Sequence, residues 1–250
     1  MNGALAAYRV RRKADVAFSI VIAGGENERI PARKRFHILY WGGQRVIRTM
    51  DIGALARGLF AELERTTFPD RDDAIYVQWP AIAMDGRVAL VPESYQTTLA
   101  RLGRRPERAG LRLPLERTIA VEPDTGRVIP IARRLEFPEV AIDRVTAMFG
   151  GDGGNRAPAL VGVDRPMSPQ VVIGHSPNGL PEEHMQPISR GRALHNMAYQ
   201  TLNIEKLGVR ALEGLGQLVE KADCYGFYAG TSTPQDRTAM LTGLVDVLKR

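Results

Sequence analysis

The chain has 250 residues, of which 44% are hydrophobic and 25% are charged, a mixture typical of a globular protein with one large domain or two small ones. No apolar run approaches the ~20 residues that a membrane span needs, and the first residues lack the apolar stretch of a secretory signal, so we expect no membrane association and a cytoplasmic protein. The single cysteine, Cys224, excludes an internal disulfide framework and a cysteine-based zinc site.

The net charge of +6 would suit a polyanionic partner. Only five of the 34 basic residues are lysines, however, and none of these lies between residues 35 and 205, a skew that fits a GC-rich bacterial coding bias. Aromatic residues make up 6% of the chain and do not alternate with arginines to form base-stacking platforms. Nucleic-acid binding is therefore kept as an alternative, and a solvated basic surface is favoured.

The first 68 residues predict an N-terminal lobe of strands and one helix. Short runs rich in β-branched and aromatic residues predict strands, and Gly42-Gly43 predicts a hairpin between the last two. Asp51 is expected to cap a helix over 52–65, in which apolar residues recur at helical spacing. The strands are expected over 16–23, 35–41 and 44–48.

Residues 69–250 predict an α/β domain with a mixed sheet and flanking helices. Helices are expected around Leu99, from Ser189 to about Asn203, over 209–222 and after a capping box at Thr233 and Asp236. Loops are expected over 150–155, which is rich in glycine, and over 176–187. Strands are expected over 74–79, 87–91, 118–121, 127–131, 159–163, 170–173 and 224–229, with a tight turn at Asp85-Gly86.

The segment 92–98 joins a predicted strand to a predicted helix, where phosphate-binding loops lie. Such a loop needs glycines that let the backbone wrap the phosphates, and a lysine that reaches the outer ones. This segment has neither and offers only Ser94, Thr97 and Thr98 with the helix N-terminus. An unrelated α/β domain, in which 92–98 is a simple connection, would explain the same pattern.

The order of elements over residues 74–248 resembles the HPr kinase/phosphorylase family, especially its bacterial relatives found beside ribosomal-peptide biosynthesis genes. The similarity lies in the Asp85-Gly86 turn and the strand up to Pro92, in Arg108–Leu113, in Ala120–Glu122, and in the tail around 187–194 and 224–225. The resemblance implies a P-loop-kinase-like sheet in 69–250, a peptide or protein partner in a bacterial biosynthetic pathway, and self-association into a homo-oligomer.

The sequence departs from the family at the residues that would carry its chemistry. The Gly-Lys-Ser/Thr signature is absent, and Glu122 is the only carboxylate at the end of the strand that should hold magnesium. The sequence therefore lacks the main protein groups that catalyse phosphoryl transfer in this family. We therefore expect a pseudokinase-like accessory or binding protein without a cofactor. The alternative is a peptide-modifying enzyme on the same scaffold, such as a phosphotransferase with an atypical loop, which would use Ser94, Thr97 or His195.

An arginine cluster follows the phosphate-loop position. Arginine forks bind phosphate and carboxylate groups bidentately, so the cluster could bind an anion or an acidic peptide. A solvated helix face is the alternative. The candidate anion- and peptide-binding residues are Arg101, Arg104, Arg105, Arg108 and Arg112, with Arg117 nearby.

The histidines and the cysteine give weaker signals. His175 and His184 could build an acid–base or metal site with Asp164, Glu182 and Glu183, but their spacing matches no helical two-histidine motif, so no metal site is predicted. His37 is expected to pack in a strand, and His195 shares a helix face with Arg192 and Tyr199. Cys224 is expected to behave as a small buried hydrophobic residue.

Overall fold

The computed structural model describes residues 17–21, 36–50, 52–100, 102, 105–112, 117–131, 165–175, 185–227 and 233–250. The described residues form two compact units, of which the first ends at Thr67 and the second begins at Phe68. The strand expected over 159–163 and the loop expected over 150–155 lie outside the described residues.

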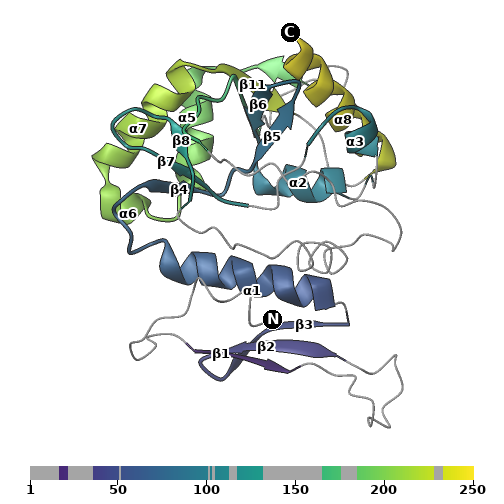
Figure 1. The fold of residues 1–250 in the computed structure, drawn as a ribbon, viewed down its shortest axis with the longest axis vertical. Coiled ribbons are helices and arrows are strands. Elements are labelled where there is room, and N and C mark those ends of the chain that lie inside the picture. Colours follow the sequence, from purple (N-terminus) through teal and green to yellow (C-terminus); the bar gives the residue numbers. More distant parts are fainter. Residues whose placement is uncertain are drawn as a thin grey trace. The chain divides into compact units, whose positions relative to one another are not determined.

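The first unit is a three-stranded antiparallel sheet followed by one helix (Figure 1). Its strands run in the order β1 (Phe18–Val21), β2 (His37–Trp41) and β3 (Gln44–Thr49), and its helix is α1 (Ile52–Thr67). Leu39 packs against Leu55 and Leu59 of α1, which explains the helical spacing of apolar residues in that segment. The strands, the hairpin and the helix expected here are confirmed.

A five-stranded mixed sheet lies at the centre of the second unit, in the order β10-β11-β9-β6-β5. The three inner strands are parallel and the two outer strands are antiparallel to their neighbours. The strands are β5 (Ala81–Met84), β6 (Arg87–Leu90), β9 (Val171–His175), β10 (Met185–Pro187) and β11 (Asp223–Phe227). A separate antiparallel sheet contains β4 (Ile75–Val77), β7 (Ile119–Val121) and β8 (Val128–Ile129) in the order β4-β7-β8.

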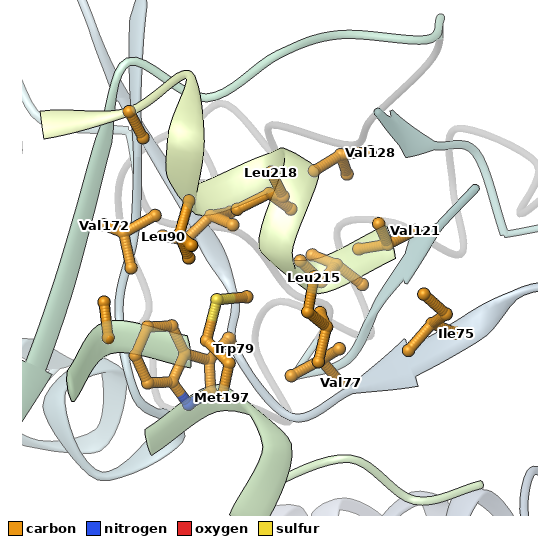
Figure 2. Close-up of a cluster of buried hydrophobic side chains, with 14 of the residues drawn as sticks. Ile75, Val77, Trp79, Leu90, Val121, Val128, Val172, Met197, Leu215 and Leu218 are labelled. Carbon is orange, nitrogen blue, oxygen red and sulfur yellow. The ribbon is translucent and has the colours of Figure 1, made fainter. Parts of the chain in front are cut away.

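Helices cover both faces of the five-stranded sheet (Figure 1). Val88 and Leu90 point to the face covered by α5 and α7, whereas Ala89 points to the face covered by α2 and α8, because side chains alternate along a strand. Figure 2 shows the first of these two cores, where Trp79 and Met197 lie beside Leu90. The helices are α2 (Glu93–Ala100), α3 (Arg105–Arg108), α5 (Arg190–Tyr199), α6 (Ile204–Leu207), α7 (Val209–Glu220) and α8 (Pro234–Lys249).

The helix caps expected at Ser189 and at Thr233 with Asp236 are present, whereas Asp51, expected to cap α1, lies outside the described residues. The Ser189 side chain accepts a hydrogen bond from the Arg192 backbone N–H at the start of α5. Thr233 and Asp236 form a reciprocal capping box at the start of α8. Two backbone N–H groups that have no partner within the helix thereby form hydrogen bonds at that helix end.

One strand was missed and two other local predictions were wrong. The strand expected over 74–79 is present as β4, but β5, which begins after Pro80 and pairs with β6, was not expected. The end of the expected loop over 176–187 forms β10, an edge strand that tolerates Pro187. Helix α5 ends at Tyr199 rather than near Asn203, because the following residues hydrogen-bond to the backbone of β4 and its flanking residues.

Candidate functional site

The carboxyl ends of three parallel strands, β6, β9 and β11, meet at one edge of the five-stranded sheet. Ligands of open α/β sheets bind outside this edge, because the loops that follow the strands converge there. At this edge, β6 continues through Val91 and Pro92 directly into α2. The strand–loop–helix connection expected from the sequence is therefore present, and its residues are the first place to look for chemistry.

An ion pair occupies the N-terminal end of α2. Glu93 lies in the first turn of the helix and its carboxylate pairs with the Arg117 guanidinium. Both side chains are partly buried, with 22% and 29% of their surface exposed. The carboxylate lies at the positive end of the helix dipole and neutralises the Arg117 guanidinium. This helix end therefore differs from a phosphate-binding loop, in which the dipole and an unpaired lysine face the phosphates.

Tyr95 of α2 packs against the ends of β9 and β11. Its side chain is 3% exposed, and its ring meets the rings of His175 and Phe227 edge-on, with centroids 5.1 and 5.7 Å apart. Its hydroxyl lies 3.2 Å from His175 Nδ1 and 3.3 Å from the Phe227 carbonyl oxygen. Burial raises the pKa of the Tyr95 hydroxyl, which stays protonated and can donate. Tyr95 thus joins α2 to the ends of β9 and β11.

His175 is the titratable side chain at this edge. Partial burial lowers the pKa of its imidazole below the ordinary value of 6.5, so the ring is neutral near pH 7. Its Nδ1 faces the Tyr95 hydroxyl, and its backbone carbonyl accepts a hydrogen bond from Asn196 Nδ2 at 3.1 Å. A neutral, exposed imidazole that is oriented by a hydrogen bond at Nδ1 can accept or deliver a proton.

The His175–Tyr95 contact was not predicted. The acid–base or metal site considered for His175 would also need Asp164, His184 and two glutamates, all of which lie outside the described residues. His175 follows the strand predicted over 170–173 by two residues. This position could have indicated a functional side chain, since α/β sheets place functional groups at the ends of their strands.

The three candidate catalytic residues do not form one constellation. Ser94 is exposed on α2, and Thr97 lies on the same helix. His195 is exposed on α5, which packs on the opposite face of the sheet. A nucleophile and its base must lie within hydrogen-bond reach of each other. Helices on opposite faces of the sheet do not bring Ser94 and His195 together in this way.

Three of the candidate anion-binding arginines lie at the surface. Arg105 and Arg108 are exposed on α3, and Arg112 is exposed where its backbone pairs with Ala83 of β5. Arg101 and Arg104 lie outside the described residues. The exposed guanidinium groups belong to the segment that follows α2. They can form hydrogen bonds to a carboxylate or phosphate from solution.

The Cys224 thiol has no features of a nucleophile. The side chain is 8% exposed, and its sulfur donates weakly to the backbone carbonyls of Val219 and Ala222. Burial raises the pKa of the thiol, which keeps it protonated and unreactive. The prediction that Cys224 packs as a small hydrophobic residue is confirmed.

Neither a metal site nor a membrane span is seen in the described part of the chain. No three histidine, cysteine or acidic side chains cluster there in a way that could hold an ion. None of the helices described has the length and apolar character needed to cross a bilayer.

Comparison with protein-family models, curated proteins and solved structures finds no match to this chain.

Proposed function

We propose that this protein is an accessory, pseudokinase-like binding protein that engages a peptide or another protein and does not transfer phosphate. The observation that carries the proposal is the β6–α2 connection. It runs from a parallel core strand to a helix without a glycine or a lysine, and the helix end carries the Glu93–Arg117 ion pair. Such a connection lacks the glycine-rich backbone cradle and the lysine that bind the phosphates of a nucleoside triphosphate.

The exposed arginines support a role in binding. Arg105, Arg108 and Arg112 present guanidinium groups at the surface after α2. Because a guanidinium recognises a carboxylate or phosphate with two parallel hydrogen bonds, this segment suits an acidic partner. The proposal includes a cytoplasmic setting, in keeping with one buried and reduced thiol, and self-association as the resemblance to the HPr kinase/phosphorylase family implies.

Calorimetric titration of the full-length protein with Mg-ATP tests this proposal. We expect no binding with a dissociation constant in the micromolar range, because the connection has no glycine or lysine and its helix end is occupied by the Glu93–Arg117 ion pair. An affinity in the micromolar range would contradict the proposal. Incubation with Mg-ATP and candidate peptides, followed by mass spectrometry, should show no added phosphate, and a phosphorylated product would favour the enzyme alternative.

A further inference from the structure

The three-stranded sheet of the first unit has an outer face, which we define as the face opposite α1. Phe18, Ile20 and Leu39 point toward α1 and pack in its core. Because side chains alternate along a strand, their neighbours point the other way. The pairing of β2 with β3 shifts by one residue between Leu39 and Tyr40, which places Arg45 and Arg48 on the same face. Cross-strand register then gives two rows on the outer face, in which β1, β2 and β3 each contribute one residue. The rows are Ser19–Tyr40–Arg45 and Val21–Ile38–Arg48.

The outer face divides into an apolar part and a cationic part. Val21, Ile38 and Tyr40 form the apolar part on β1 and β2, and Val21 is 48% exposed although it is a large aliphatic residue. Arg45 and Arg48 form the cationic part on β3, and both are exposed. Residues 17–21 and 36–50 contain no aspartate or glutamate, so no acidic side chain of these strands neutralises the two arginines.

A cation–π contact at the edge of this face restricts what it can bind. The Arg48 guanidinium lies 3.7 Å from the centroid of the Phe36 ring. The contact orients the guanidinium and covers one ring face that a nucleobase would need for stacking. Tyr40 is the other aromatic residue on this face, and it is half-buried. An apolar stripe with one such ring beside two arginines suits aliphatic and acidic side chains better than it suits a nucleic acid.

We propose that the outer face docks an acidic segment of a peptide or protein partner, in which aliphatic residues alternate with glutamate or aspartate. The aliphatic side chains would cover Val21 and Ile38, and the carboxylates would pair with Arg45 and Arg48. The choice of partner rests on charge complementarity, since Arg45 and Arg48 are exposed and the described strand residues 17–21 and 36–50 include no aspartate or glutamate. This inference rests on the proposed binding function and gives it a second surface.

Fluorescence anisotropy of a short labelled peptide that alternates glutamate and leucine tests the inference on the full-length protein. A peptide that alternates lysine and leucine and a single-stranded oligonucleotide are the comparison probes. We expect micromolar binding of the acidic peptide, and the double variant Arg45→Glu/Arg48→Glu should weaken it by about tenfold or more, because two attractive contacts become repulsive. The double variant Lys206→Glu/Lys249→Glu makes the same change of charge at exposed sites in α6 and α8 and should leave the affinity within about twofold.

An uncharged pair of variants separates docking from general electrostatic attraction. Val21→Ser should weaken the acidic peptide, whereas Val209→Ser, at a residue of α7 that is 69% exposed, should not. Circular dichroism establishes that each variant folds, and Arg45→Gln/Arg48→Gln replaces the glutamate pair if that pair unfolds.

Absence of binding by the acidic peptide would overturn the inference. Equal losses in the two charge-reversal variants would also do so, as would tighter binding of the oligonucleotide through Arg45 and Arg48. None of these results bears on Mg-ATP, so the inference and the proposed function can fail separately.

Discussion

Asn203 shows how one buried amide connects segments that are distant in the sequence. The side chain is 1% exposed, its Oδ1 accepts from the Tyr76 N–H at 3.0 Å, and its Nδ2 donates to the carbonyls of Arg71 and Ala74 at 2.8 and 2.7 Å. All three bonds hold the start of β4 against the connection between α5 and α6. A fully satisfied buried amide of this kind fixes one geometry.

Replacing Asn203 with aspartate should therefore destabilise the protein strongly. The substitution keeps the shape, removes both donors and places a carboxylate against two carbonyl oxygens. We expect a loss of about 2–4 kcal/mol in the free energy of unfolding, measured by urea denaturation. Asn196→Asp, at a partly exposed amide, is the matched control and should cost less. Equal losses in the two variants would contradict this account of Asn203.

His175 should make stability depend on pH in a defined direction. Burial lowers the pKa of its imidazole in the folded state, so the unfolded chain binds a proton more readily as the pH falls below 6.5. The contribution is fully present above that pH and is lost on acidification. Relative to His175→Asn, the wild type should therefore lose unfolding free energy from pH 7 toward pH 5, in parallel denaturation series. A difference between the two proteins that stays constant over this range would show that folding does not lower the pKa of the imidazole.

At the scale of the element, helix α7 packs unusually closely on the turn between β7 and β8. A Cβ built on Gly214 would lie 2.6 Å from the Pro123 carbonyl oxygen, and one built on Gly126 would lie 2.6 Å from the Leu218 nitrogen. Gly126 also has a φ of +66°, which favours glycine. The two glycines allow the backbones of the turn and the helix to approach each other.

Two alanine substitutions in α7 should therefore have opposite effects. Gly214→Ala should destabilise the protein by about 1–3 kcal/mol, because the new methyl group overlaps backbone atoms that cannot move away cheaply. Gly216→Ala, where a Cβ meets nothing within 4 Å, should be neutral or stabilising by up to about 1 kcal/mol, since alanine favours a helix. Thermal unfolding of both variants gives the comparison, and similar melting temperatures would exclude close packing at Gly214.

Elements with local signals were predictable from the sequence. The Gly42-Gly43 hairpin, the Ser189 cap and the Thr233–Asp236 capping box depend on a few adjacent residues, and all are present. Strands β5 and β10 were missed because three or four residues carry little periodicity, and their pairing is set by distant partners.

The candidate site was predictable only in part. The position of the β6–α2 connection follows from the order of the elements, and the absence of glycine and lysine can be read directly from the sequence. The contact between Tyr95 and His175 joins residues 80 positions apart, and the Glu93–Arg117 pair likewise depends on the fold. Side-chain partners across such separations have no local pattern that could reveal them.

At the scale of the whole molecule, two separate surfaces present arginines. One is the segment with Arg105, Arg108 and Arg112 in the second unit, and the other is the outer face of the sheet in the first unit. The helix end at the phosphate-loop position differs from both, because its Glu93 carboxylate is paired with Arg117. This difference is the basis for proposing that the protein recognises an acidic partner with its surface arginines and does not bind a nucleotide at the sheet edge.

Hydrogen–deuterium exchange of the full-length protein with and without millimolar Mg-ATP, read on peptides that cover residues 87–100, tests the central claim most directly. If the β6–α2 connection cannot hold phosphates, its amides should exchange at the same rate in both samples. Protection by Mg-ATP that is confined to these amides would show that a nucleotide binds there, and would contradict the account.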